Sequence, residues 1–132
     1  MIVVGVDFSE GSGAAVAAGR GLAEDRDEPL RVVHILRDVN GQWEPGPEAS
    51  RWMRCNAVEP GEVEVRRGVP WVELVRAAEE WGAHFVVAGT HGSTGFQPFR
   101  LGNTASMLAL RSRTPVVLAP ARQPTHNAKE TR

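Results

Sequence analysis

Residues 84–104 read HFVVAGTHGSTGFQPFRLGNT, and this stretch decides how the chain folds. It begins with an apolar run over residues 84–88 that is typical of a buried strand, and it leads into a helical stretch. The glycines between the two include Gly89, Gly92 and Gly102. Glycines between a strand end and a helix start let main-chain N–H groups approach an anion closely, so the stretch indicates a phosphate-binding loop.

The rest of the chain alternates short apolar strands with helical segments. Strands are expected at residues 2–6, 30–36, 62–67, 84–88 and 115–119, and helices at 10–25, 70–81 and 102–113, with a short helix near 48–57. Trp52 and Met53 are expected to face the core from that short helix. Such alternation requires parallel pairing through right-handed crossovers, so the sequence predicts a doubly wound α/β sheet with helices on both faces. Ligands bind such sheets beyond the carboxyl ends of the strands, where Asp7, Ile35 and the glycine loop should converge.

Length, charge and cysteine content exclude several classes of protein. At 132 residues and 42% hydrophobic residues, the chain has the size of one domain, expected over residues 1–120, with residues 121–132 as a disordered polar tail. A net charge of -1 provides no basic field for nucleic acid or an anionic membrane, and the apolar runs are far shorter than the roughly 20 residues that span a bilayer. The single cysteine, Cys55, allows neither an internal disulfide nor a zinc cluster, so a cytoplasmic protein is expected.

The glycine loop resembles the nucleotide motif of the universal stress proteins, in which Gly89, two residues, Gly92, nine residues and Gly102-Asn103 follow one another. The resemblance extends to VVGVDFS at residues 3–9, VHI at 33–35 and TPVVL at 114–118, and so covers residues 2 to about 120. It implies a Rossmann-like sheet with strand order 3-2-1-4-5. It also implies an ATP ligand, or else ADP or AMP, with or without Mg²⁺.

The same resemblance implies which positions contact the nucleotide. The main chain of Val6 and Asp7 and the side chain of Ile35 would surround the adenine and ribose, and the glycine loop would follow the ribose and α-phosphate. Free N–H groups at the start of the last helix would favour the terminal phosphates, because a helix N-terminus carries a partial positive charge. The expected binding residues are Val6, Asp7, Phe8, Ile35, Ala88, Gly89, His91, Gly92, Gly102, Asn103 and Thr104.

Two of these residues have a purely structural alternative. Asp7 could serve only to cap the first helix, and a lone loop histidine such as His91 is more often a solvent-exposed donor than a catalytic group. The sequence between Gly89 and Gly102 contains no Asp or Glu to activate water. It therefore indicates a binding protein with no catalytic residue and no metal ligand set, and at most slow ATP hydrolysis.

The resemblance to the universal stress proteins implies a small stress-response regulator whose state depends on a bound nucleotide. The apolar strand from Pro115 to Ala119 falls at the end of the sheet, where it should form a homodimer contact. The family more often has Ser or Thr where this chain has Asn103, and the segment 38–61 is short for the family. The alternative is therefore a dimeric interaction module with a vestigial, empty nucleotide pocket.

Overall fold

The computed structural model describes residues 1–37, 40, 42–92 and 100–121. The strands are β1 (Ile2–Val6), β2 (Leu30–Leu36), β3 (Val63–Arg67), β4 (Phe85–Gly89) and β5 (Val116–Ala119). The helices are α1 (Glu10–Arg26), α2 (Pro47–Cys55), α3 (Pro70–Glu80) and α4 (Asn103–Arg111), with a 3-10 turn, η1, at Pro60–Glu62. Every predicted strand and helix is confirmed, with boundaries that differ by at most two residues. Of the predicted tail, only Ala121 is among the described residues.

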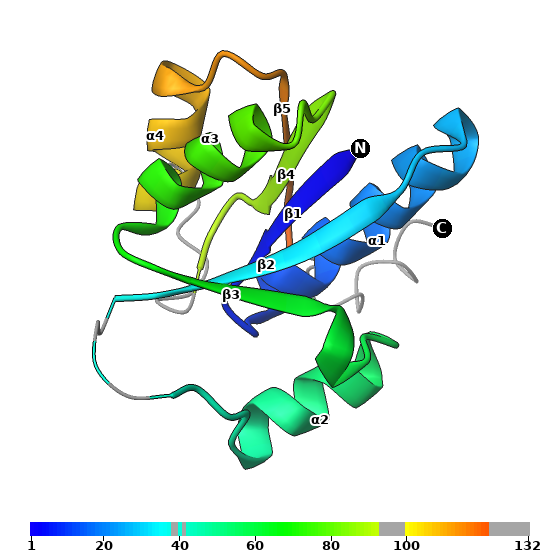
Figure 1. The fold of residues 1–132 in the computed structure, drawn as a ribbon, viewed down its shortest axis with the longest axis vertical. Coiled ribbons are helices and arrows are strands. Elements are labelled where there is room, and N and C mark those ends of the chain that lie inside the picture. The colour runs from blue at the N-terminus through cyan, green and yellow to red at the C-terminus, as the bar shows by residue number, and fades with distance from the viewer. Residues whose placement is uncertain (38–39, 41, 93–99, 122–132) are drawn as a thin grey trace, which may run out of the picture.

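The strands form one parallel sheet in the order β3-β2-β1-β4-β5 (Figure 1), which confirms the predicted fold and strand order. From β1 the chain proceeds outward to β2 and β3, and it then returns to β4 and β5 on the other side of β1. The direction of winding therefore reverses between β1 and β4. In open α/β sheets this reversal opens a crevice at the carboxyl ends of the two strands.

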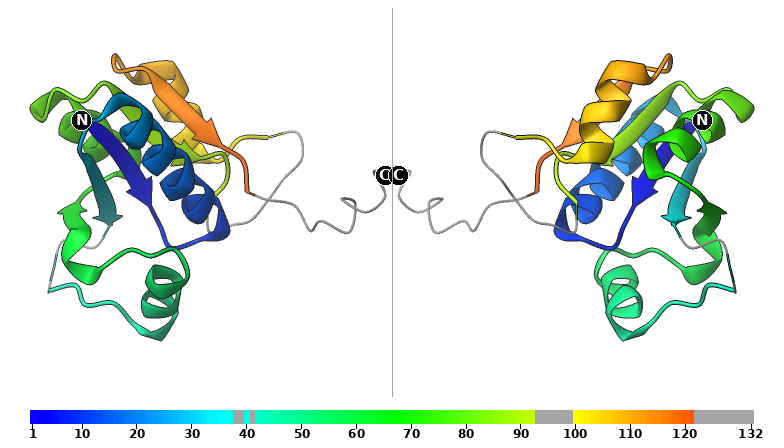
Figure 2. Two further views of the ribbon diagram at one scale, coloured as in Figure 1. Left: turned by 90° about the vertical axis from the view of Figure 1, so that its right-hand side faces the viewer. Right: turned by 90° about the vertical axis from the view of Figure 1, so that its left-hand side faces the viewer.

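Helices cover both faces of the sheet, as the views in Figure 2 show. Neighbouring sheet residues alternate between the two sides: Val4 faces α1 and α2, whereas Val3 faces α3 and α4. The first core consists of Ile2, Val4, Val6, Ala15, Val16, Val32, Trp52, Met53, Val58, Val87 and Ala119, and the second of Val3, Val33, Leu74, Ala78, Val86, Ala88 and Leu108. Burial on both faces explains why the strands are continuous apolar runs, and the predicted inward position of Trp52 and Met53 is confirmed.

Helix α1 begins directly after β1 because Ser9 caps it. The Ser9 hydroxyl accepts a hydrogen bond from the Ser12 N–H at 3.3 Å, which satisfies one of the donors that a helix N-terminus leaves unpaired. Gly19 lies so close to β1 that a Cβ atom there would come within 2.5 Å of Val4 Cγ2. The glycines of α1 thus let this helix pack unusually close to the sheet.

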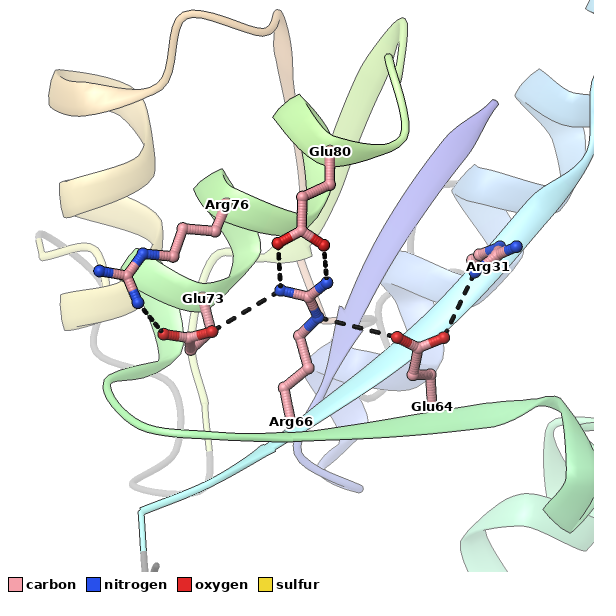
Figure 3. Close-up of polar contacts among 6 residues, drawn as sticks. All are labelled: Arg31, Glu64, Arg66, Glu73, Arg76 and Glu80. Carbon is pink, nitrogen blue, oxygen red and sulfur yellow. Dashed lines mark hydrogen bonds and ion pairs between the residues drawn. The ribbon is translucent and has the colours of Figure 1, made fainter.

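The two edges of the sheet differ in character. Edge strand β3 carries a network of ion pairs centred on Arg66, whose guanidinium donates to both carboxylate oxygens of Glu80 on α3 (Figure 3). The remaining pairs of this network are Arg66–Glu64 and Arg66–Glu73, each at 3.7 Å, Arg31–Glu64 at 3.3 Å and Arg76–Glu73 at 2.9 Å. Charges along an edge oppose pairing with a further strand, whereas β5, at the other edge, has the apolar sequence VVLA.

Within the described part of the chain, none of the helices has the length and apolar character needed to cross a membrane.

Candidate functional site

The candidate site lies where β1 and β4 end on either side of the reversal in winding. Asp7 directly follows β1, Gly89 is the last residue of β4, and Gly102 precedes α4. The structure therefore brings the predicted residues of the first strand, the glycine loop and the last helix to one edge of the sheet. Residues 93–99 of the loop, including Pro98, lie outside the described residues.

Asp7 is held by the start of α1. Its Oδ1 accepts hydrogen bonds from the Ser9 N–H at 3.1 Å and from the hydroxyls of Ser9 and Ser12. A Cβ placed on Gly92 would lie 2.7 Å from Asp7 Oδ2, so the second oxygen faces the glycine loop. The carboxylate thus takes part in starting α1, as the capping alternative expects, and it also forms one wall of the site.

The glycine loop supports the start of α4. The Gly102 N–H donates to the Thr90 carbonyl at 2.7 Å, which ties the N-cap of α4 to the loop after β4. The sequence predicts a free N–H at Gly102 for a phosphate. This prediction is wrong, because the Gly102 N–H donates to the Thr90 carbonyl. The role of Gly102 in the site is therefore its lack of a side chain, which lets it lie close to the loop. A Cβ there would lie 3.3 Å from the Thr90 oxygen and 3.4 Å from His91 Cα.

The N-terminus of α4 is suited to an anion. The first N–H groups of a helix have no acceptor within the helix, and Gly102 at the N-cap has no side chain to offer one. The first turn of α4, which is described in full, contains no acidic residue that would neutralise the partial positive charge. Asn103 is exposed and Thr104 is half-buried. The N–H groups from Asn103 onward are therefore the donors that this helix presents at the edge of the sheet.

His91 is tied into the loop through both ring nitrogens. Nε2 meets the carbonyl of Arg100 and must donate to it, so in the neutral ring Nδ1 accepts from the Thr90 hydroxyl at 2.8 Å. These bonds join the two described ends of the loop, residues 90 and 100. Within the described residues, no three His, Cys, Asp or Glu side chains lie together as a metal-binding group. The contacts of His91 are those of a residue that shapes the loop.

The remaining predicted residues divide between the two faces of the sheet. Ile35 and Ala88 pack on the side of α3 and α4, and Val6 packs on the side of α1 and α2. The Val6 carbonyl accepts a hydrogen bond from the His34 Nδ1–H at 2.9 Å. Sequence alone places these residues at strand ends but does not say which face each side chain takes at the end of a strand.

Phe8 belongs to an aromatic cluster under α2. It adopts a left-handed backbone (φ 64°), and its ring stacks on Trp43 with centroids 5.7 Å apart and meets Trp52 edge-on at 5.3 Å. The Trp52 indole N–H donates to the Ser9 carbonyl at 2.7 Å. Phe8 therefore anchors α2 to the end of β1. Trp43 was not among the predicted residues, because it lies in a segment rich in proline and glycine that shows no periodicity.

A separate open cavity of about 800 Å³ lies between α1, α2 and the end of β5. Its walls include Glu10, Ala14, Glu48, Trp52, Cys55 and Ala119. None of the predicted binding residues, all of which are described, lines this cavity. The predicted site is instead an exposed arrangement of main-chain donors and a carboxylate at the ends of β1 and β4.

Solved structures with this fold show which class of protein the architecture defines. The hypothetical protein MJ0577 superposes with a TM-score of 0.71 over 93% of this chain and 97% of that chain, at 17% identity, which is a likeness of fold. A universal stress protein in complex with cAMP is 25% identical, with a TM-score of 0.62 over 92% of this chain and 96% of that one. A universal stress protein from Archaeoglobus fulgidus in complex with dAMP is 25% identical, with a TM-score of 0.58 and coverages of 89% and 95%.

The sequence gives the same classification. The model of the universal stress protein family matches residues 55–120. Universal stress protein Rv2028c of Mycobacterium tuberculosis is 31% identical in an alignment that covers 93% of this chain and 49% of that protein. The chain therefore belongs to the universal stress protein family. It spans about half the length of the M. tuberculosis relatives that it matches.

Proposed function

We propose that this chain binds an adenine nucleotide, ATP or else ADP or AMP, at the carboxyl edge of the sheet between β1 and β4. The observation that carries the proposal is the N-terminus of α4, which has no side-chain cap and no acidic residue in its first turn. Its position beside the glycine loop is set by the hydrogen bond from the Gly102 N–H to the Thr90 carbonyl. The complexes of two family members with cAMP and dAMP support an adenine nucleotide as the ligand.

Each part of the proposed site has a distinct role. The N–H groups of Asn103 and Thr104 receive the terminal phosphates, and the Asn103 side-chain amide is a further donor. The main chain of Gly89 and Gly92 contacts the ribose and α-phosphate. The missing Cβ atoms leave room for the Gly11 backbone at Gly89 and for Asp7 Oδ2 at Gly92, which sets the position of this main chain. The main chain of Val6 and Asp7 and the side chain of Ile35 contact the adenine and ribose, with Mg²⁺ as a candidate companion of the phosphates.

The proposed activity is regulation by occupancy. A nucleotide that contacts the end of β1, the glycine loop and α4 stabilises the arrangement in which these three elements lie together, by a free energy that grows with the logarithm of one plus the ratio of its concentration to its Kd. The state of a cytoplasmic stress-response protein would thereby depend on its nucleotide. The sequence of the glycine loop holds no carboxylate, and Oδ1 of Asp7 is bonded to Ser9 and Ser12, so we assign no catalytic residue and expect at most slow ATP hydrolysis.

The contrast between the sheet edges favours a homodimer through β5. The apolar strand from Val116 to Ala119 pairs with β4 on one side only, and the ion pairs of Arg66 occupy the opposite edge. An edge strand without charges is the part of a sheet that most readily pairs with a second copy. We therefore place the dimer contact at residues 115–119.

One observation favours the alternative of a dimeric module with an empty pocket. The Gly102 N–H already has an acceptor, and Gly92 lies against Asp7 Oδ2, so part of the predicted cradle is engaged internally. In this alternative the loop would only connect β4 to α4. We prefer the nucleotide proposal because these internal contacts leave the donors of Asn103 and Thr104 to the terminal phosphates, at a helix start with no side-chain cap.

Retained ligand and direct titration separate the two functions. The purified protein is denatured and released nucleotides are identified by mass spectrometry, and the protein is then titrated calorimetrically with ATP, ADP and AMP, with and without Mg²⁺. We expect an adenine nucleotide to be released or bound at one site per chain. Absence of retained nucleotide together with no heat of binding up to millimolar ATP would establish the empty module. Turnover of several ATP per chain per minute would require an enzyme instead.

A further inference from the structure

Gly11, in the first turn of α1, lies against the loop that follows β4. A Cβ on Gly11 would lie 2.3 Å from the His91 carbonyl oxygen. From the other side, a Cβ on Gly89 would lie 2.7 Å from the Gly11 carbonyl oxygen and 3.0 Å from Gly11 Cα. Real Cβ atoms essentially never come within 3.0 Å of such atoms. The two backbones therefore meet glycine to glycine, with no room for a side chain at either position.

The opposite side of the same loop contacts the start of α4. The Gly102 N–H donates to the Thr90 carbonyl at 2.7 Å, and a Cβ on Gly102 would lie 3.5 Å from the Gly92 nitrogen. Residues 89–92 thus form a single backbone layer between the first turn of α1 and the N-cap of α4. A change on the α1 side of this layer is transmitted to the α4 side through direct backbone contacts.

We infer that Gly11 is a positioning residue of the proposed nucleotide site: it sets the position of residues 89–92 and, through Gly102, that of the N-terminus of α4. The inference rests on the proposed function and extends it to a residue that is not among the proposed nucleotide contacts. Resemblance to the family assigns no role to Gly11. Its role follows from the close contact of its backbone with His91 and Gly89.

The strain of a side chain at Gly11 would fall on the loop because α1 is fixed elsewhere. The Ser9 carbonyl, just before α1, accepts the Trp52 indole N–H at 2.7 Å, and Gly19 lies tightly against Val4 further along the helix. The new Cβ would lie 2.3 Å from the His91 oxygen, and relief of the contact requires a separation of at least 3.0 Å. Binding sites require their groups to be held within roughly 0.5 Å, so this displacement is large enough to misplace the donors of α4.

Helix α1 supplies two matched controls. Gly21→Ala makes the same substitution where no atom lies within 4 Å of the new Cβ. Gly19→Ala places the Cβ 2.5 Å from Val4 Cγ2, in the core and away from the site, so it lowers stability without pressing on the loop. Calorimetric titration with ATP should show affinity reduced by about tenfold or more in Gly11→Ala, because the site tolerates only roughly 0.5 Å of displacement. Both controls should keep the wild-type affinity, although Gly19→Ala melts at a lower temperature.

Amide NMR spectra of the nucleotide-free variants give a second, independent readout. Gly11→Ala should shift the resonances of residues 89–92 and 102–104, and Gly21→Ala should leave them in place. If Gly11→Ala does not fold, Gly102→Ala presses on the same layer from the other side by only a few tenths of an ångström, and it should shift the amides of residues 89–92 and of Gly11.

The two readouts distinguish failure of the inference from failure of the proposed function. If the wild-type protein binds ATP and the Gly11→Ala variant binds it with equal affinity, the positioning role is overturned and the proposed function remains intact. If the wild-type protein binds no nucleotide, the proposed function is overturned. The amide NMR shifts would then be the only test of whether Gly11 sets the position of residues 89–92 and of the start of α4. Shifts confined to α1 in Gly11→Ala would show that the layer does not transmit the change.

Discussion

Ser12 and Asp7 are joined by reciprocal hydrogen bonds. The Asp7 N–H donates to the Ser12 hydroxyl oxygen at 2.7 Å, and that hydroxyl donates to Asp7 Oδ1. Ser12 is only 4% exposed, whereas Asp7 is exposed, so these bonds tie a buried hydroxyl in α1 to a residue at the surface after the end of β1. A single buried hydroxyl thereby fixes both the backbone and the carboxylate at one wall of the proposed site.

Removal of this hydroxyl should weaken both stability and binding. In Ser12→Ala the Asp7 N–H loses its part-buried hydrogen bond, which costs about 0.5–1.5 kcal/mol of unfolding free energy. The Asp7 carboxylate loses one of its orienting donors, so affinity for ATP should also fall. Urea denaturation and calorimetric titration measure the two effects, with Ser50→Ala on α2 as the control. Wild-type values for Ser12→Ala in both measurements would contradict the role assigned to this pair.

A branched side chain at the N-cap of α4 should abolish nucleotide binding while the fold survives. The Cβ of Gly102→Val would lie 3.3 Å from the Thr90 oxygen, and its methyl groups would cover the N–H groups of the first turn. Gly46→Val is a matched control, because Gly46 is the N-cap of α2 and has no atom within 4 Å of a new Cβ. Circular dichroism checks the fold and ATP titration checks binding. Equal affinity of the Gly102→Val variant and the wild-type protein would remove the phosphates from α4.

A negative charge at Asn103 should move stability and binding in opposite directions. Asn103 is the first residue of α4, and an acidic residue there stabilises a helix by about 0.3–1 kcal/mol. The same charge repels phosphates, so Asn103→Asp should unfold at a higher temperature and bind ATP more weakly. Asn103→Ser, which is neutral and keeps a donor, should retain affinity. Stronger ATP binding by the aspartate variant would be incompatible with an anion site at this helix.

The Glu80 carboxylate should make stability depend on pH. Hydrogen bonds from the Arg66 guanidinium hold the pKa of Glu80 below its usual value, and Glu80 in turn raises the pKa of Arg66 (Figure 3). A glutamate whose folded pKa lies below the ordinary value of about 4.3 stabilises the protein above that pH, and the contribution is lost as the pH falls through the lowered folded value. Urea midpoints should therefore be lower for Glu80→Gln than for wild type at pH 7, and the difference should shrink in acid. Glu79→Gln, at the neighbouring position, is the control, and a difference that grows in acid would refute the assignment.

A charge on β5 should separate the proposed dimer. Val117→Asp places a carboxylate on the apolar edge strand, and light scattering at matched concentrations should show monomers. Val63→Asp is the corresponding change on β3, and Val63 packs against the same core as Val117, so it tests the loss of core packing without altering the β5 edge. Dimers that persist in Val117→Asp, or that dissociate equally in Val63→Asp, would place the contact elsewhere.

The sheet could be predicted from the sequence because each of its strands and helices is marked by residues that lie close together in the chain. The apolar runs of β1 and β2, the Ser9 cap and the helix-opening Pro70 each mark an element within a few residues, and alternation then dictates parallel pairing. The position of Asp7, Gly89 and Gly102 at one edge follows from the same reasoning. Each of these features is confirmed.

The details of the site could not be predicted because they depend on contacts between distant segments. The acceptor of the Gly102 N–H is Thr90, and the partner of Gly11 is His91, and no periodicity in the sequence relates these pairs. The left-handed backbone of Phe8, which turns its ring toward Trp43, is equally a product of tertiary packing. Candidate residues for the site could be named from the sequence, whereas their hydrogen-bond partners could not.

The glycines of α1 have a consequence for the order of folding. Four of its residues, Gly11, Gly13, Gly19 and Gly21, each cost about 1 kcal/mol of helix propensity relative to alanine. A free peptide of this sequence should be a random coil, because these glycines remove much of its helix propensity and most helical stability in proteins comes from tertiary packing. We therefore expect the segment to become helical only against an assembled sheet, so that the proposed ligand-binding surface arises late on the folding pathway and is missing from any intermediate that precedes docking of this helix.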